Sequence, residues 1–299
     1  MKKKQSTIKN STSDRAFMII IGIIMTIVSI LILYPLYYVI IASFTDPNIV
    51  NTGKLLLYPE KLFLEGYIRI FQIKSIWIGY ANTILYTTVG TMVSVILTVP
   101  GAYVLSRKDF VGRKIIMYFI TFTMFFQGGI IPLFLVIQNI NIYNTIWAVT
   151  LPYAVSVWNL IICRSFFNES ISDELLNAAQ IDGAEDFEFF FKIVLPLSKT
   201  IIAVMILFYA TTLWNSYFPA LMFLMDNDKM PLQVILRDLI IVNQISGMTG
   251  DVEEMERRMK LAEQLKYGII LVATLPMLII YPFIQKYFVK GIMIGAVKG

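Results

Sequence analysis

The most distinctive charged chemistry of this sequence lies in one stretch, Phe167 to Lys199, between two long apolar segments. Residues 169 to 188 carry seven acidic side chains and no basic one. A helix that merely lies on a membrane surface would want Lys and Arg on its polar face, so the acidic charge disfavours that alternative. The stretch is therefore a candidate functional element.

A second group of chemically useful residues is uncharged and lies within apolar segments. Aromatic rings stack on the faces of sugars, and amides form hydrogen bonds with hydroxyl groups. A path for carbohydrates is therefore expected to contain aromatic and amide side chains and no buried charge. The candidate residues for such a path are Asn82, Tyr86, Gln127, Asn159, Trp214, Asn215 and Tyr217. For each of them, an interfacial aromatic position or a hydrogen bond between helices is an equally open alternative.

Spacing predicts how some of these residues are arranged. Asn82 and Tyr86 are four positions apart and share one helix face. Small residues beside them favour a helix-packing seam over a pore lining. This stripe consists of Thr83, Thr87, Gly90, Ser94 and Thr98. Gln127, next to two glycines, marks a broken or bent helix. A further shared face is predicted for Thr211, Asn215 and Pro219.

Several kinds of catalytic chemistry are missing from the sequence. The chain has no histidine and a single cysteine, Cys163, which excludes an internal disulfide and a cysteine metal cluster. It contains no GxxxxGK[ST] phosphate loop for binding and hydrolysing ATP. The apolar runs contain no Asp, Glu, Lys, Arg or His, which disfavours proton-coupled transport. We therefore expect no enzymatic activity, metal or cofactor in this chain.

The elements that must position these residues are long apolar runs. Of 299 residues, 57% are hydrophobic and 15% are charged, which is typical of a membrane protein. After a polar tail (1–15), the pattern predicts an all-α integral membrane protein with six transmembrane helices. The predicted spans are about 16–44, 75–106, 115–138, 145–163, 200–225 and 267–285. The first run is too long for a cleavable signal peptide.

Two short helices that meet at Gly183 are predicted within the acidic stretch. Ser172 suits the N-cap of the first, whose apolar face consists of Leu175, Leu176 and Ala179. Gly183 suits the left-handed residue that often ends a helix. The second helix is expected to begin at Glu185 and to end at Pro196. One side of it is expected to carry Phe187, Phe190, Phe191 and Val194.

Two polar segments are expected on the opposite side of the membrane, at 45–74 and 226–266. Within the first, residues 62–71 suit a short amphipathic helix on the membrane surface. Within the second, residues 251–266 are predicted to be helical, because Glu and Arg or Lys recur four positions apart in the favourable order.

The distribution of positive charge predicts the orientation. Six spans place both termini on one side, together with the 107–114 turn and the acidic stretch. The segments on this side hold fifteen Lys and Arg, whereas the opposite segments hold ten. Because cytoplasmic loops carry the excess of Lys and Arg, we expect both termini and residues 167–199 on the cytoplasmic side, with the chain crossing the plasma membrane several times.

The acidic stretch resembles the EAA loop of bacterial ABC importer permeases. The resemblance rests on Asn177-Ala178-Ala179, Asp182-Gly183-Ala184, Ile193 and Leu195-Pro196. In that family the loop is the coupling helix that docks into a cleft on the ATPase subunit. The resemblance implies a coupling role for Asn177, Ala178, Ala179, Asp182, Gly183, Ala184, Phe187, Leu195 and Pro196. Asn177 departs from the family, which usually has Glu there for a salt bridge.

Other short motifs resemble the carbohydrate-uptake branch of these permeases, to which the maltose permease subunit belongs. They are Asn82-Thr83, Ala102-Tyr103 with Arg107, Gly112-Arg113, Trp214-Asn215 and the stretch Gly295 to Gly299. The resemblance extends from about Phe17 to the end of the chain. The long 226–266 segment resembles the oligosaccharide or polysaccharide-fragment subgroup, whose members often import uronate-containing fragments.

The resemblance also implies a molecular context. Residues 16–299 would form a type-1 ABC transmembrane domain, paired with a second, homologous permease in a heterodimer. Two ATPase subunits would carry ATP and Mg, and an extracellular solute-binding protein would contact residues 226–266. The chain would also contact membrane lipid. No nucleic acid would be expected as a partner. The alternatives are a permease for amino acids or peptides, an ion-coupled secondary transporter and a membrane scaffold without transport.

Overall fold

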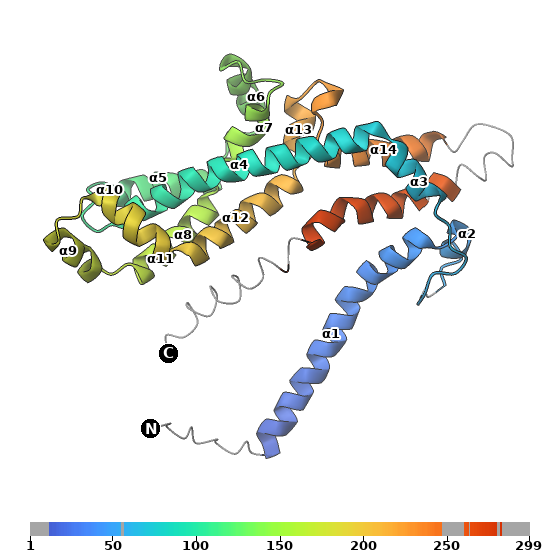
Figure 1. The fold of residues 1–299 in the computed structure, drawn as a ribbon, viewed down its shortest axis with the longest axis horizontal. Helices are drawn as coiled ribbons and strands as arrows, with labels where there is room; N and C mark the ends of the chain where they lie inside the picture. The colour runs from blue at the N-terminus through green and yellow to red at the C-terminus, as the bar shows by residue number, and fades with distance from the viewer. Residues whose placement is uncertain (1–11, 55–56, 247–259, 263, 280–281, 283–299) are drawn as a thin grey trace. The chain divides into compact units, whose positions relative to one another are not determined.

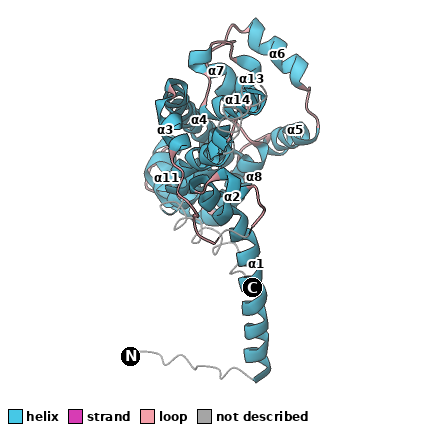
Figure 2. Cartoon of the chain, turned by 90° about the vertical axis from the view of Figure 1, so that its right-hand side faces the viewer, coloured by secondary structure: helices cyan, strands magenta, loops and turns pink. Residues whose placement is uncertain are grey.

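A computed structural model describes residues 12–54, 57–246, 260–262, 264–279 and 282, and most of them are helical (Figure 1, Figure 2). In this part of the chain, the only β pairing is an isolated bridge between Thr45 and Leu62. The prediction of an all-α chain is confirmed for these residues. The chain divides into two compact units, Met1–Ile70 with Val242–Val272 and Phe71–Ile241 with Ala273–Gly299.

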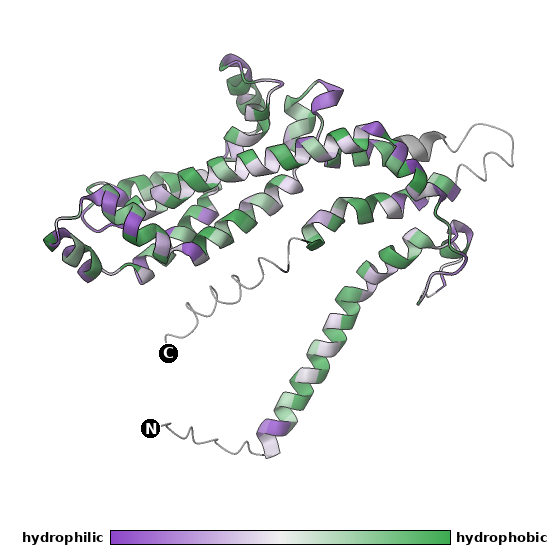
Figure 3. Ribbon diagram, viewed as in Figure 1, coloured by the Kyte–Doolittle hydropathy of each residue, from purple (hydrophilic) through white to green (hydrophobic). Residues whose placement is uncertain are grey.

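The first unit contains α1, Thr12–Phe44, a single helix of 33 residues with Pro35 inside it. Its side chains are apolar and exposed along most of its length, whereas Ile41, Ala42 and Ser43 are buried near its end. A helix of this length rises roughly 50 Å, which exceeds the roughly 30 Å hydrocarbon core of a bilayer. The exposed apolar surface is therefore what a bilayer would cover (Figure 3).

Two short helices follow α1 in the first unit. They are α2, Pro47–Val50, and α3, Glu65–Gln72, which extends two residues into the second unit. The short helix predicted within residues 62–71 is thus confirmed, although its place on a membrane surface stays a prediction. Within this unit, the rings of Phe44 and Tyr67 stack with their centroids 5.1 Å apart, which ties α3 to the end of α1.

Gln264 is a buried polar hub of the first unit, with 1% of its surface exposed. Its Oε1 accepts a hydrogen bond of 2.7 Å from the backbone N–H of Gly66, and its Nε2 donates to the carbonyls of Ser43 and Phe63. A side chain at position 66 would place its Cβ 2.5 Å from Gln264 Oε1, so glycine is required there. The hub satisfies backbone groups that would otherwise be buried without partners.

The second unit is organised around α4, Lys74–Ser106. Two helices lie along it in Figure 1: α8, Val157–Ser170, and α12, Lys199–Trp214. A hydrogen bond of 2.7 Å joins Thr98 of α4 to the Tyr209 hydroxyl of α12. The residues of the predicted second span form one continuous helix that starts one residue earlier, and its crossing of a membrane stays a prediction.

Small residues of α4 allow close packing, as the predicted seam requires. A Cβ at Gly90 would lie 2.8 Å from Leu213 Cδ1, and a Cβ at Gly79 would lie 3.0 Å from the Leu232 Cα. Of the predicted seam residues, Thr83, Gly90, Ser94 and Thr98 are buried, and Thr87 is partly buried. The packing-seam interpretation is confirmed for these positions.

The predicted third span is broken near Gln127. Here α5, Arg113–Phe125, and α6, Ile130–Asn139, are bent by 116° relative to each other. Gly129 adopts φ +83° immediately before α6, a left-handed conformation that favours glycine. The predicted break is confirmed.

The fourth predicted span is also bent, and its helix continues further than expected. It consists of α7, Ile146–Thr150, a 3₁₀ turn at Leu151–Tyr153, and α8, with a bend of 51°. Pro152 lies in the turn and has no N–H to continue a helical ladder. The helix α8 continues past Cys163, the expected end of the span, to Ser170 and includes Phe167, so the point at which the span ends stays a prediction.

The fifth predicted span, 200–225, is wrong as a single helix. Its first part, α12, ends at Trp214, and α13, Phe218–Phe223, begins after a short break. Thr211, Asn215 and Pro219 therefore do not share one face of a continuous helix. Pro219 lies in the first turn of α13, where its missing N–H costs no helical hydrogen bond.

The segment 226–266 contains more helix than predicted. The helix α14, Leu232–Ser246, lies where the sequence predicts only a polar segment. The helix predicted at 251–266 is observed from Lys260, whereas residues 251–259 lie outside the described part. The sixth predicted span overlaps a helix over Lys260–Ile279. Residues 1–11 and 283–299 also lie outside the described part of the chain; they include most of the polar N-terminal tail (1–15) and the stretch Gly295 to Gly299.

The number of membrane spans stays a prediction. Three described helices are long and apolar enough to cross a membrane, and up to six spans result if each bent helix pair counts as one. The third of these pairs joins Asp186–Leu197 to α12 with a bend of 77°.

Candidate functional site

The acidic stretch folds into two helical arms, which we call the elbow (Ser172 to Ser198). Its first arm is α9, Asp173–Ile181, and Ser172 Oγ caps it by accepting a hydrogen bond from the Leu175 N–H. Gly183 follows with φ +84°, the left-handed conformation expected there. Both predicted features of this arm are confirmed.

The second arm of the elbow is helical from Asp186 to Leu197, but it is not a uniform α-helix. It contains α10, Asp186–Phe189, a π turn at Phe190–Val194 and α11, Leu195–Leu197. Pro196 has no N–H for the carbonyl four residues earlier, and the wider turn directly precedes it. The expected end at Pro196 is one residue early, because the chain bends at the buried Ser198.

The π turn changes which side chains face the core. Phe189, Phe190 and Val194 are buried, whereas Phe187 and Phe191 are 78% and 61% exposed. The prediction that Phe187, Phe190, Phe191 and Val194 share one side is therefore wrong, because an extra residue per turn rotates the helix faces. The buried members join a core cluster with α4, α8 and α12.

The residues assigned a coupling role divide into a surface set and a supporting set. The exposed ones are Asn177, Ala178, Asp182, Gly183, Phe187 and Pro196. Ala179 is buried, and Ala184 and Leu195 are partly buried against the same core cluster. Sequence reasoning missed Ile181, which is 87% exposed at the end of α9. The elbow thus exposes two large apolar side chains, Ile181 and Phe187, next to the glycine bend.

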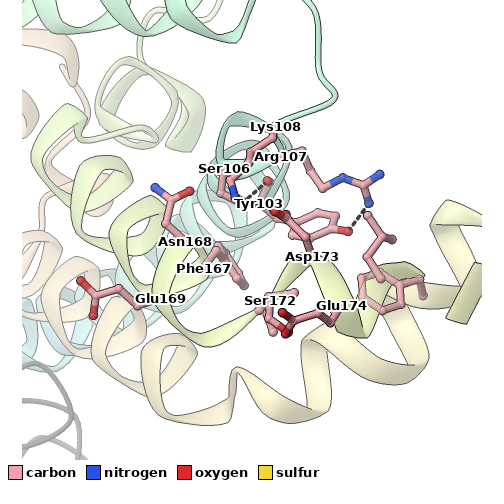
Figure 4. A pocket seen from close by; sticks show the side chains of 13 residues that line it. Tyr103, Ser106, Arg107, Lys108, Phe167, Asn168, Glu169, Ser172, Asp173 and Glu174 are labelled. Carbon is pink, nitrogen blue, oxygen red and sulfur yellow. Dashed lines mark hydrogen bonds and ion pairs between the residues drawn. The ribbon is translucent and has the colours of Figure 1, made fainter. Parts of the chain in front are cut away.

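A short loop after α4, which we call the bracket (Arg107 to Gly112), contacts both arms of the elbow. Lys108 Nζ lies 2.5 Å from Asp173 Oδ2 in the first arm. Arg107 lies 3.5 Å from Asp186 in the second arm. Figure 4 shows bracket and elbow side chains around a cavity of about 290 Å³ at this place. In the sequence, these cations contribute to the predicted orientation, and Arg107 also to the family resemblance, but neither predicts the pairing with the elbow.

The charge of Arg107 is firmly held, because its side chain is 13% exposed and makes three hydrogen bonds in addition to its ion pair with Asp186. It donates two hydrogen bonds, of 2.8 and 2.5 Å, to Asp109, and one of 2.9 Å to the Tyr103 hydroxyl. These hydrogen bonds hold the pKa of the Asp109 carboxyl below its usual value and raise the pKa of Arg107. Both groups therefore stay charged at neutral pH.

Ring contacts and arginine side chains hold the same end of α4 against the elbow, α8 and the start of α5. The Tyr103 ring lies 5.7 Å from that of Phe167 and 5.1 Å from that of Phe190. Arg113 donates to the Arg107 carbonyl, and Arg164 of α8 donates to the Leu105 carbonyl. The elbow, the bracket and α4 form one packed assembly.

Two residues proposed for a carbohydrate path bind backbone of the chain instead of pointing freely outward. Asn82 Nδ2 donates to the carbonyls of Asp228 and Met230, and the Tyr86 hydroxyl donates to that of Lys229. Between them, the hydroxyl of Thr83 accepts from the Leu232 N–H. This face of α4 holds the loop before α14.

The other proposed path residues are not gathered in one site. Trp214 is 4% exposed, and its indole N–H donates to the Ala273 carbonyl. Asn159 is buried in α8, whereas Gln127 is exposed in the break after α5. Asn215 is exposed and donates to the Thr211 carbonyl, and Tyr217 is 45% exposed. A role for any of these residues in a substrate path stays a prediction.

Known sequences are similar to this chain over most of its length. The family model of the binding-protein-dependent transport system inner membrane component matches residues 75–294. The polygalacturonan/rhamnogalacturonan transport system permease protein YtcP of Bacillus subtilis (strain 168) is 44% identical over 283 residues, 94% of this chain and 98% of that protein. Protein LplC of the same strain is 35% identical over 293 residues, 98% of each chain.

A solved structure has the same fold. One chain of a bacterial ABC transporter involved in the import of the acidic polysaccharide alginate matches with a TM-score of 0.81 and 34% identity. The match covers 94% of this chain and all of that one. The resemblance stated from the elbow motif is confirmed at the level of the family.

Proposed function

Because this chain belongs to the family of binding-protein-dependent transport system inner membrane components, we propose that it is the permease subunit of an ATP-driven oligosaccharide importer. The observation that carries the proposal is the elbow, an acidic helix pair bent at Gly183 that exposes Ile181 and Phe187 and is packed against the end of α4. Apolar side chains exposed beside a fixed bend suit docking to another protein.

In the proposed mechanism, the exposed side of the elbow binds an ATPase subunit on the cytoplasmic face of the bacterial plasma membrane. ATP and Mg are held by two such subunits, so this chain needs no catalytic residues of its own. Closure of the ATPase pair displaces the elbow, and a second, homologous permease completes the pathway. An extracellular solute-binding protein delivers the sugar to the opposite face, where the 226–266 segment is proposed to meet it.

Fragments of acidic polysaccharides are the proposed substrate class. Similarity to a permease named for polygalacturonan and rhamnogalacturonan, and to a transporter chain from an alginate importer, supports uronate-containing oligosaccharides over amino acids or peptides. The uncharged, aromatic-rich spans suit a path that contacts sugar rings while leaving the carboxylates of the substrate hydrated.

Uptake by the reconstituted complex tests this substrate assignment. The chain is purified with its partner permease, ATPase and binding protein and placed in vesicles that contain ATP on the ATPase side. We expect uptake of oligogalacturonate at least ten times faster than that of a neutral oligosaccharide of equal length, and no loss of uptake when an uncoupler is added. Equal uptake of both sugars would contradict the acidic substrate class, and loss with the uncoupler would favour ion coupling.

A further inference from the structure

The bracket is the one segment that forms ion pairs with both arms of the elbow within the described residues. Lys108 pairs with Asp173 at the start of the first arm, and Arg107 lies beside Asp186 at the start of the second. The two acids flank the Gly183 bend on either side. A movement that opened or closed the bend would therefore change the distance between two points that the bracket holds together.

The orientation of the Arg107 side chain does not depend on its ion pair with Asp186. Its guanidinium is fixed by two hydrogen bonds to Asp109, by the Tyr103 hydroxyl and by the Tyr103 ring, whose centroid lies 5.9 Å away. The side chain of Asp186 is 73% exposed, so it is the adjustable member of the pair. Because Arg107 is fixed and Asp186 is adjustable, the ion pair between them favours one orientation of the second arm relative to the end of α4.

At its other end, α4 holds the loop that precedes α14. Asn82, Thr83 and Tyr86 bind backbone groups of residues 228–232 there. The single helix α4 therefore connects the elbow to this loop without a break. Because one helix makes both sets of contacts, a displacement of α4 as a rigid body would move both of them.

We infer that the bracket passes the movement of the elbow to α4, with Arg107 as the positioning residue for the second arm and Lys108 for the first. The inference rests on the proposed function, since it concerns how ATPase docking becomes a change in the transport pathway. The apolar cluster around Tyr103 supplies adhesion between the same elements, and the ion pairs set the angle between them.

The substitution Asp186→Asn tests the inference cleanly, because it leaves the contacts of Arg107 with Asp109 and Tyr103 in place. Glu188→Gln is the matched control: Glu188 lies on the same arm, but its partner Lys192 is in that arm too, at 2.5 Å. In the reconstituted complex we measure sugar imported per ATP hydrolysed. We expect Asp186→Asn to lower this ratio by roughly two- to fivefold, because one exposed ion pair sets only a modest bias. Glu188→Gln should keep the wild-type ratio.

A second pair of variants addresses the first arm. Asp173→Asn should lower the same ratio, whereas Glu174→Gln should not, since no cation lies within ion-pair distance of Glu174 among the described residues. The exposed Lys108–Asp173 pair also permits a charge exchange. Lys108→Asp combined with Asp173→Lys should restore the ratio, which a loss of folding stability alone would not predict.

The outcomes separate this inference from the proposed function. Wild-type ratios in both Asp186→Asn and Asp173→Asn would overturn the inference, and so would an equal fall in Glu188→Gln, which would indicate a general effect of acidic charge. If the wild-type chain fails to bind ATPase or to import sugar, the proposed function fails instead. Thermal unfolding midpoints of the complexes should stay unchanged, so a fall in the ratio without a change in midpoint supports the positioning role.

Discussion

At the scale of single residues, Gly183 is the position on which the elbow most depends. Its φ of +84° lies in the left-handed region, and no atom lies within 4 Å of the place where a Cβ would be added. A substitution there is therefore limited by backbone strain and not by space. An ordinary residue in this conformation costs about 1–2 kcal/mol, whereas asparagine adopts it more readily.

We therefore expect Gly183→Pro to abolish sugar-stimulated ATP hydrolysis, because proline fixes φ near −65° and cannot form the bend. Gly183→Asn should retain most of the stimulation and serves as the matched variant at the same site. Both proteins should insert into the membrane at wild-type levels, as judged by immunoblotting of membrane fractions. Normal stimulation in Gly183→Pro would argue against a coupling role for the bend.

Residue patterns predicted the first arm of the elbow well because its signals are local. Ser172, the acids beside it and Gly183 each act within one helical turn, so their positions suffice to locate the N-cap and the bend. The pairing of Arg107 with Asp186 was not predictable in this way. It joins residues far apart in the sequence, and only the packing of α4 against the elbow brings them together.

At the scale of elements, hydrophobicity located the apolar segments but not their breaks. The run 200–225 carries no charge, so nothing in its composition distinguishes one helix from two. The break follows the end of α12 at Trp214, and the local signal beside it is Pro219, which suits the first turn of a new helix. The π turn at Phe190–Val194 is a similar case, because helical periodicity assumes a constant number of residues per turn.

The packing of α4 offers a prediction of its own. A Cβ at Gly79 would lie 3.0 and 3.1 Å from backbone atoms of Leu232, which cannot move without disturbing the start of α14. At Gly101 in the same helix, the nearest atom would be Leu160 Cδ1 at an ordinary 3.8 Å. We expect Gly79→Ala to destabilise the protein by about 1–3 kcal/mol, as overpacked sites do.

Gly101→Ala is the control, and it should be neutral or stabilising by up to about 1 kcal/mol, because alanine favours helix over glycine. Thermal unfolding in one detergent compares the two variants with the wild type. Equal shifts for both would contradict the close approach of α4 and α14.

At the scale of the whole molecule, α4 sets the distance between the two functional ends. The hydrogen bonds of Tyr86 hold the loop at Lys229, and Arg107 begins the bracket. The helical rise between these two residues is roughly 30 Å, about the thickness of the hydrocarbon core of a bilayer. If α4 crosses the membrane, as its length and composition permit, the elbow and the 226–230 loop lie on opposite faces.

Site-specific labelling tests this arrangement most directly. The only native cysteine, Cys163, is fully buried, so the wild-type chain should not react with a membrane-impermeant thiol reagent. The exposed Glu185→Cys and Asp228→Cys positions report on the two ends. In sealed, right-side-out vesicles we expect the reagent to label Asp228→Cys and not Glu185→Cys. In inside-out vesicles we expect it to label Glu185→Cys, and bound ATPase subunit should protect this position. Labelling of Glu185→Cys from the outer face would contradict the account, since the elbow could not then meet an ATPase.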